Sequence, residues 1–324
     1  MCTAISYKTK DHYFGRNLDL EYCYQETVTI TPRNYVFEFR ECGRLEQHYA
    51  MIGMAYVVEG YPLYYDATNE KGLSMAGLLF SGSTCYREFR EGKENVSPFE
   101  FIPWILGQCA TVEEAKARLQ KLNLVELHFN EQLRLTPMHW LIADREHSIV
   151  VEAVAEGLMV HDNPVGVLTN NPPFEYQMMN LNQYMGLSRK GPENRFAAGL
   201  EFTPYSKGMG AMGLPGDLSS SSRFVRAAFH KLNSVAGETE VESVNQFFHL
   251  LGSVEMPRGS LEMGKDLYEI TVYSSCCNTD KGIYYYTTYE NRQIVGVDMY
   301  KADLEGTEVV SYELVKSPDF VICN

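Results

Sequence analysis

The second residue of the chain is a cysteine, and its place beside Met1 is the first feature that suggests chemistry. The side chain of Cys2 is small, so removal of Met1 is chemically reasonable and would give Cys2 a free α-amine with an ordinary pKa of about 7.7–8.0. Such an amine can act as a base near neutral pH, and a cysteine activated by its own amino group needs no separate histidine. The position is equally compatible with a cysteine that is simply part of a buried first strand.

A cysteine used in this way needs a cation that favours the thiolate and an acid that holds the amine. The segment FGRNLD offers Arg16 and Asp19 for these roles. If residues 3–7 form a strand and residues 12–17 its hairpin return, both side chains lie near the start of the chain. An acyl-transfer site also needs N–H donors for an oxyanion. The residues alone are therefore compatible with an acyl-transfer site at the first hairpin, and the buried-strand alternative stays open.

Other motifs in the sequence favour structural interpretations. Residues 208–213 match GxGxxG, but they run into Leu214-Pro215-Gly216 and lack the flanking strand and helix of a dinucleotide site, so we expect a loop. The serines at 219–222 have no GxSxG elbow and are expected to cap a helix that carries Arg223 and Arg226. The chain has no HExxH or CxxC motif, so we expect no metal, and the thiols of Cys276 and Cys277 should stay free.

Composition restricts the class of partner. The 324 residues carry a formal net charge of −14 without a basic cluster, which argues against nucleic acid and an anionic membrane surface. No apolar stretch approaches the roughly 20 residues that span a bilayer, and the first twenty residues lack the apolar region of a signal peptide. We therefore expect a cytoplasmic protein that acts on a small molecule. No repeat or linker divides the chain, so one domain over 1–324 is expected.

The elements that must hold these residues can be read from periodicity. Capping boxes at Ser97 and Thr111 predict two consecutive helices between 97 and 122, and further helices are expected over 243–251 and from about Ser222. Strands are expected at 28–33, 49–58, 139–144, 148–154, 166–171, 268–275, 282–289 and 293–299, with residues 276–281 as a hairpin loop. Strands interrupted by groups of helices favour an α+β fold with antiparallel sheets and outer helices.

Several longer segments together resemble the choloylglycine hydrolase family of N-terminal-nucleophile (Ntn) hydrolases. They are MCTAI at the start, FGRNLD at 14–19, NEKGLSMAGL at 69–78, DNPVGVLTNNP at 162–172 and GLPGDLSSSSRFVRAAF at 213–229. The resemblance is strongest to the bile salt hydrolases of lactobacilli and enterococci. It implies the Ntn-hydrolase fold, a four-layer αββα sandwich.

The resemblance also implies roles for residues far apart in the chain. Cys2 would be nucleophile and base, and Arg16 and Asp19 would position and tune it. Asn170 would donate a side-chain N–H to the oxyanion, and Arg223 would balance charge at the site.

The activity implied is hydrolysis of the amide that joins a bile acid to glycine or taurine, without a metal or organic cofactor. The family forms homotetramers, and the Gly- and Pro-rich segment 186–216 would be an assembly loop. A steroid needs an apolar pocket. We expect Leu18, Tyr24, Leu133 and Leu135 to line it.

One position departs from the family pattern. Leu79 stands where bile salt hydrolases usually have Asn and penicillin V acylases often have Tyr. A leucine side chain donates no hydrogen bond, so the backbone N–H of Leu79 would have to serve as oxyanion donor. The departure leaves two alternatives open: a penicillin V acylase with the same mechanism, and a weakly active or non-catalytic bile-acid-binding homologue.

Overall fold

Two antiparallel sheets form the centre of the computed structural model, which describes residues 1–318 and 320–323. The six-stranded sheet has the order β14 (Val167–Leu168), β1 (Cys2–Lys8), β2 (His12–Leu20), β17 (Ile270–Asn278), β18 (Ile283–Thr288) and β19 (Val295–Asp298). The eight-stranded sheet has the order β13 (Gly157–Asp162), β12 (Ser148–Val154), β11 (Met138–Ala143), β8 (Ser74–Leu79), β7 (Tyr61–Asn69), β6 (Met51–Val58), β3 (Thr27–Thr31) and β20 (Val310–Glu313).

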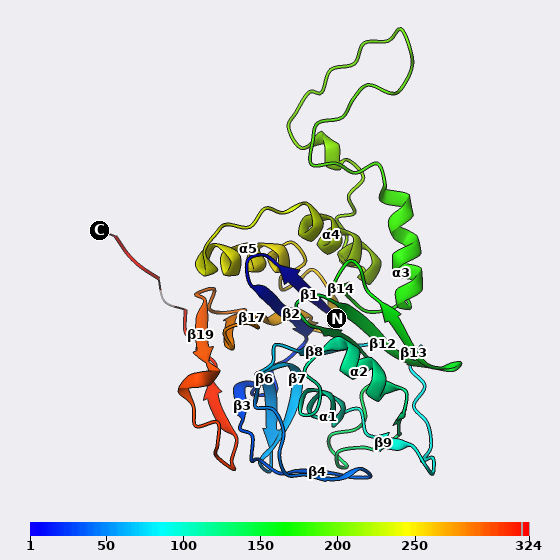
Figure 1. Cartoon of the computed structure of the whole chain (residues 1–324). Coiled ribbons are helices and arrows are strands. Elements are labelled where there is room, and N and C mark those ends of the chain that lie inside the picture. Colours follow the sequence, from blue (N-terminus) through cyan, green and yellow to red (C-terminus); the bar gives the residue numbers. More distant parts are fainter. Residues whose placement is uncertain (319, 324) are drawn as a thin grey trace.

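Helices cover the outer face of each sheet (Figure 1). On the six-stranded sheet, α4 (Ser220–Asn233) contacts β1 and α5 (Glu240–Gly252) contacts β17 and β2, while α3 (Phe174–Asn180) lies against α4. On the eight-stranded sheet, α1 (Phe101–Leu106) contacts β7 and β8, and α2 (Val112–Leu119) joins the same apolar cluster. The predicted four-layer αββα sandwich is therefore confirmed.

The smaller elements lie outside these layers. They are the pairs β4 (Phe37–Phe39) with β5 (Gly43–Leu45), β9 (Glu94–Val96) with β10 (Leu122–Leu124), and β15 (Glu262–Gly264) with β16 (Leu267–Tyr268), and the short 3₁₀ helices Leu181–Tyr184, Met209–Ala211 and Met299–Lys301. Residues 208–213 form an irregular segment around one of these turns, as predicted.

The first hairpin forms as the sequence predicts, because β1 and β2 pair in register from Cys2 opposite Leu18 to Lys8 opposite His12. Nearly every residue of both strands is buried, since one face meets the second sheet and the other meets α4 and α5. This double burial explains why the hairpin can hold Arg16 and Asp19 away from water.

The helix caps confirm the predicted starts of α2 and α4, whereas α5 begins at Glu240 after its cap Thr239, earlier than the predicted residue 243. Thr111 accepts a hydrogen bond from Glu114 N at the start of α2, and Ser219 accepts one from Ser222 N at the start of α4. The prediction that Ser97 caps α1 is wrong: α1 begins later, after Glu100, because residues 97–100 form a turn and the Ser97 hydroxyl donates to Leu127 O at 2.9 Å.

Two further expectations need correction. The hairpin loop expected at 276–281 begins too early, since Cys276, Cys277 and Asn278 belong to β17 and pair with β18. Both thiols are fully buried and free, so they pack as small apolar side chains and extend the strand. Helix α3 was not predicted.

The segment between α3 and α4 extends away from the body of the molecule (Figure 1). Residues 191–208 of this segment are exposed throughout. The predicted assembly loop, 186–216, lies here.

Candidate active site

Cys2 is the first residue of β1 and is 3% exposed. It lies directly opposite Leu18 on β2, so the two side chains share one face of the sheet, and Arg16, two residues before Leu18, faces the same way. That face meets the second sheet, because Arg16 Nη1 donates to the carbonyls of Tyr65 at 3.0 Å and Gly77 at 2.5 Å on β7 and β8. The thiol and the guanidinium therefore lie between the two sheets.

The structure contains Met1, whose amine marks the place next to Cys2. This amine donates to the carbonyl oxygen of Asp19 at 2.8 Å and pairs with the carboxylate of Glu269. Glu269 is itself buried, so the ion pair is partly shielded from water. The chain start is thus held at the end of the first hairpin by backbone and charge together.

Asn170, which follows β14, connects the chain start to both sheets. Its Oδ1 accepts from Cys2 N at 2.9 Å and from Arg223 Nη2 at 2.8 Å, and its Nδ2 donates to Leu79 O at 2.7 Å. Ser220, at the start of α4, accepts from Asn170 N at 2.8 Å. An amide nitrogen has two hydrogens, so one hydrogen of Asn170 Nδ2 remains for another acceptor.

Arg223 reaches the same point from the second turn of α4. It is fully buried, and its Nη1 donates to Cys2 O at 2.5 Å and to Thr3 Oγ1 at 2.7 Å, while its Nε donates to Leu218 O at 3.1 Å. Burial lowers the pKa of this guanidinium, opposed by the nearby Asp19 carboxylate. The fork of donors fixes the backbone of β1 at Cys2 and the orientation of the Asn170 amide.

Asp19 and Arg16 are both fully buried on β2. Asp19 Oδ1 accepts from the Thr271 hydroxyl at 2.6 Å, whereas Asp19 Oδ2 and Arg16 Nη2 have no hydrogen-bond partner within the described residues. Burial raises the pKa of Asp19 to about 6, against the lowering effect of Arg223 and the chain-terminal ammonium. Burial opposes the charge of Arg16, but Cys2, Tyr273 and the acids around it raise its pKa overall.

The structure thus brings Cys2, Arg16, Asp19, Asn170, Arg223 and Leu79 together. The other predicted pocket residues are arranged differently. Leu18 is buried beside Cys2, whereas Tyr24 is 37% exposed and its hydroxyl bonds Tyr22. Leu133 and Leu135 are half-buried in the loop after β10, where their backbone N–H groups donate to Asn130 and His128.

Sequence reasoning missed three buried polar residues near this cluster. Glu269 holds the chain-terminal amine, and Thr271 bonds Asp19. Asp66, on β7, accepts from the hydroxyls of Tyr273 at 2.6 Å and Tyr284 at 2.7 Å, and burial raises its pKa. The signal that could have found Glu269 and Asp66 is an acid inside an apolar or aromatic strand, since a buried charge needs partners.

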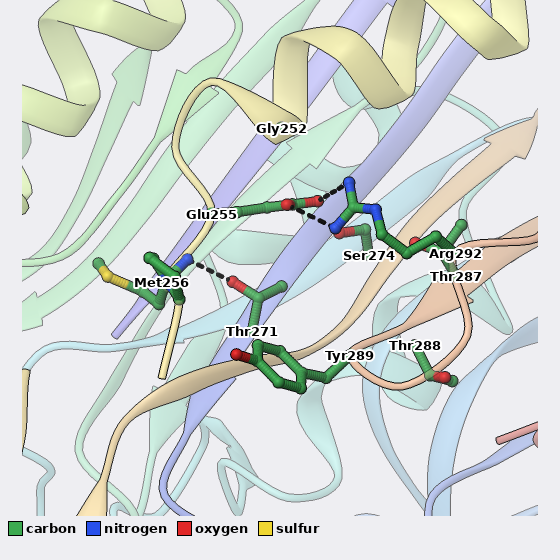
Figure 2. A pocket seen from close by; sticks show the side chains of 10 residues that line it. Gly252, Glu255, Met256, Thr271, Ser274, Thr287, Thr288, Tyr289 and Arg292 are labelled. Atoms are coloured by element: carbon green, nitrogen blue, oxygen red, sulfur yellow. Dashed lines mark hydrogen bonds and ion pairs between the residues drawn. The ribbon is translucent and has the colours of Figure 1, made fainter. Parts of the chain in front are cut away.

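A cavity of about 430 Å³ lies on the helix side of Asp19. Figure 2 shows its lining, with the Glu255–Arg292 ion pair on one side and the bond from Met256 N to Thr271 on the other. The Thr271 hydroxyl also donates to Asp19, so one side chain borders both the cavity and the Cys2 cluster. In the described chain, no three His, Cys, Asp or Glu side chains lie together as metal ligands, and no helix is long and apolar enough to span a membrane.

Comparison with known proteins gives consistent results. Residues 2–312 match the model of the linear amide C–N hydrolases, choloylglycine hydrolase family. The chain is 55% identical to the bile salt hydrolase/transferase of Lactiplantibacillus plantarum over 100% of both chains, and 40% identical to that of Clostridium perfringens over 98% of both.

The solved structures agree with the sequences. A mutant conjugated bile acid hydrolase from Clostridium perfringens superposes with a TM-score of 0.92 at 38% identity, and all of both chains is covered. A penicillin V acylase from Agrobacterium tumefaciens reaches a TM-score of 0.76 at 21% identity, covering 97% of this chain and 92% of the other. That second likeness shows the shared fold alone.

Proposed function

The chain belongs to the choloylglycine hydrolase family of linear amide C–N hydrolases, and we propose that it hydrolyses the amide between a bile acid and glycine or taurine through Cys2. The observation that carries the mechanism is the 2.9 Å bond from Cys2 N to Asn170 Oδ1. It joins the nitrogen that would become the base to the side-chain amide that would donate to the oxyanion. The substrate class is supported by sequence identities of 55% and 40%, over 100% and 98% of the chains, with proteins named bile salt hydrolase/transferase.

The reaction begins once Met1 is removed. The freed α-amine of Cys2 takes the thiol proton, and the buried guanidinium of Arg16 favours the thiolate. The thiolate attacks the amide carbonyl, and its oxyanion accepts from the remaining hydrogen of Asn170 Nδ2 and from Leu79 N–H. The amine then gives its proton to the leaving nitrogen, and glycine or taurine departs from a thioester.

Water completes the reaction. The same α-amine takes a proton from water, which attacks the thioester and releases the bile acid while the Cys2 thiol is restored. Asp19 and Arg223 offset each other's buried charge beside Cys2 throughout. The relatives' names also include transferase, and an amine in place of water would attack the same thioester.

The substrate's steroid body needs an apolar surface close to the thiol. We propose that Leu18 forms the base of this surface, because it is buried directly opposite Cys2. Tyr24 and the loop with Leu133 and Leu135 would contact the outer part of the steroid. Their partial exposure supports a place at the rim.

The compartment and the assembly are parts of the same proposal. All eight cysteines are free thiols, including the neighbouring pair Cys276 and Cys277, which fits the reducing cytosol. The mostly exposed segment 186–216 carries apolar side chains that a homotetramer would bury.

The rival activity within the family is penicillin V acylase, and Leu79 leaves the preference open between the two. Assay of glycine- and taurine-conjugated bile acids beside penicillin V tests it, with faster turnover of the conjugates expected. A large excess of penicillin V turnover would overturn the bile salt assignment. Binding of a conjugate without turnover, in protein that lacks Met1 by mass spectrometry, would support the non-catalytic alternative.

Replacement of the nucleophile gives the most direct prediction. Cys2→Ala should abolish turnover without unfolding the protein, because alanine fits where the small thiol is buried. Cys2→Ser should retain at most a trace, since a hydroxyl is the poorer nucleophile. Cys276→Ala, at a fully buried cysteine of the same sheet, is the matched control and should keep turnover. Retained activity in folded Cys2→Ala would refute the role of Cys2.

A further inference from the structure

A buried histidine, His139 on β11, lies behind the residues proposed to bind the oxyanion. It is completely buried, and the reaction described above does not use it. Its Nε2 lies 2.9 Å from Thr169 O, the carbonyl just before Asn170. A carbonyl can only accept, so Nε2 carries a hydrogen and donates it there.

The ring of His139 also contacts the residue next to Leu79, the second proposed oxyanion donor. Phe80, which directly follows Leu79, stacks on His139 with ring centroids 4.2 Å apart and an angle of 5° between the planes. Thr169 and Asn170 follow β14 of the six-stranded sheet, whereas Leu79 and Phe80 come at the end of β8 of the eight-stranded sheet. His139 therefore contacts the neighbour of each donor, one from each sheet.

Glu152 on β12 holds the ring in this orientation. Its Oε1 lies 3.0 Å from His139 Nδ1 and also accepts from Phe174 N at 3.1 Å. Glu152 is buried and directly opposite His139 in the sheet, so the pair is fixed by strand register. Phe174 is the first residue of α3, and residues 169–173 lead to it from β14. The two side chains therefore bond to both ends of the segment that contains Asn170.

We propose that His139, held by Glu152, is a positioning residue that sets the distance between the two oxyanion donors, the Asn170 side-chain amide and the Leu79 backbone N–H. The proposal rests on the proposed function, because it takes over the assignment of those two donors. The only direct hydrogen bond between the donor residues is Asn170 Nδ2 to Leu79 O at 2.7 Å. Bonds from Cys2 N and Arg223 orient the Asn170 side chain, and Leu79 is joined to it only through this carbonyl. The His139 ring adds a contact beside each donor, with the Thr169 carbonyl and with the Phe80 side chain.

Two substitutions separate the contacts of the ring. His139→Gln keeps a donor near the position of Nε2, which can reach Thr169 O, whereas His139→Asn is too short for that contact. Loss of an oxyanion donor lowers kcat by roughly 10²–10³-fold in enzymes that use such donors. We expect His139→Asn to lower kcat by about 10²-fold with KM changed less than about 3-fold, and His139→Gln to recover at least about a tenth of the lost rate.

A second buried histidine provides the matched control. His48 is 8% exposed, both of its ring nitrogens lie within hydrogen-bond distance of backbone carbonyls (Tyr49 and Tyr35), and its ring packs against Phe37. These contacts lie in the second apolar cluster, away from Cys2. His48→Asn should lower the thermal midpoint as much as His139→Asn does, yet leave kcat near the wild-type value.

Inhibitor binding gives a readout that stability does not move. The inhibitor is the bile acid with an aldehyde in place of the scissile amide. Its tetrahedral adduct with Cys2 would place an oxygen at the oxyanion donors, whereas the free bile acid forms no such adduct. His139→Asn should weaken the aldehyde by about the factor lost in kcat and leave binding of the acid unchanged. If the substitution prevents folding, Phe80→Leu is the second variant, because it removes the ring stacking and keeps the hydrogen bonds of His139. It should lower kcat and aldehyde affinity by smaller factors and leave binding of the acid unchanged.

Three results would overturn the positioning role: kcat of folded His139→Asn and Phe80→Leu within about 3-fold of wild type, an equal loss in His48→Asn, or equal weakening of aldehyde and acid. Failure of the proposed function is seen separately, in the wild-type protein. If the wild type turns over penicillin V in place of bile salt conjugates, kcat of each variant relative to wild type is measured with penicillin V. The comparison still applies, since the oxyanion forms in both reactions.

Discussion

Asp19 is a fully buried carboxylate that shares its surroundings with Arg223 and the chain-terminal ammonium. Its pKa of about 6 lies above the ordinary value of 3.8 because burial favours the neutral form. Between pH 3.8 and about pH 6, the Asp19 carboxyl is therefore mostly protonated in the folded protein and mostly ionised in the unfolded chain. The contribution of Asp19 to stability is largest below pH 3.8 and decreases as the pH rises to about 6.

The same titration predicts how activity depends on pH. Only the ionised carboxylate offsets the buried charge of Arg223 beside Cys2, so kcat/KM should rise through an apparent pKa near 6. Asp19→Asn cannot ionise and should be slower and lack this acid limb. Rates between pH 4.5 and 8 for both proteins check the prediction. A wild-type limb that persists unchanged in Asp19→Asn would assign it to another group.

At the scale of elements, the hairpin that carries Arg16 is pressed against β17 at Gly15. A Cβ atom at Gly15 would lie 1.9 Å from Ser275 O, so no side chain fits there without moving backbone. Ser275 also accepts from Arg16 N at 3.1 Å and donates to Asp66 at 3.3 Å. A shift at this point would therefore displace Arg16 and the strand that supports it.

Gly15→Ala should destabilise the protein by about 1–3 kcal/mol or more, the cost of overpacking a tight core, and should also lower turnover. Gly216→Ala is the matched control, because a Cβ there meets nothing within 4 Å and its backbone angle is ordinary. Thermal melts and turnover of the three proteins measure the difference. A stable and fully active Gly15→Ala would show that β2 and β17 can separate at no cost.

The elements also show which parts of the site the sequence could predict. The Cys2–Arg16–Asp19 group follows from local pattern, because an alternating strand and its hairpin return place these residues together. Asn170 and Arg223 came only from family resemblance, since their contacts with Cys2 span 168 and 221 residues and leave no spacing signal. Thr111 as a cap was predicted from a local motif, whereas Ser97 failed because its hydroxyl bonds a distant carbonyl.

Residues such as His139 and Glu269 illustrate a further limit. His139 is a polar residue in a mostly apolar strand, and Glu269 directly precedes β17. The importance of each depends on partners far away in the chain. A polar residue among apolar neighbours indicates that it is buried, but a single sequence does not show which partners it meets. The fold class was predictable because it depends on the order of elements, whereas these contacts depend on register between strands.

At the scale of the whole molecule, both sheets include strands from early and late parts of the chain. One domain over 1–324 remains a prediction. One segment extends from the body between α3 and α4 (Figure 1). It exposes Phe196 at 83%, Phe202 at 57% and Tyr205 at 84%. Exposed aromatic side chains at this density are typical of a surface that another chain covers.

Shortening this segment should therefore change the oligomeric state. Replacement of residues 191–208, all exposed, by a short Gly-Ser linker should convert the proposed tetramer to smaller species without unfolding the sandwich. Light scattering after gel filtration measures the mass, and a thermal melt checks the fold. The substitution Tyr22→Ser, at an exposed aromatic residue outside the segment, is the control and should leave the mass unchanged. A tetramer that survives the deletion would place assembly elsewhere.

The contacts of Met1 also affect how the protein can be produced and attached to supports. The Met1 amine pairs with Glu269 and donates to the Asp19 carbonyl, so a fusion partner placed ahead of Met1 would have to leave from this partly buried place. It would also block removal of Met1 and leave the Cys2 nitrogen in a peptide bond. Affinity tags and immobilisation linkers therefore belong at the other end, where residues 315–318 are exposed and the chain leaves the body (Figure 1). The host also matters: a strain deficient in methionine aminopeptidase should yield folded protein that a purity gel cannot distinguish from active enzyme.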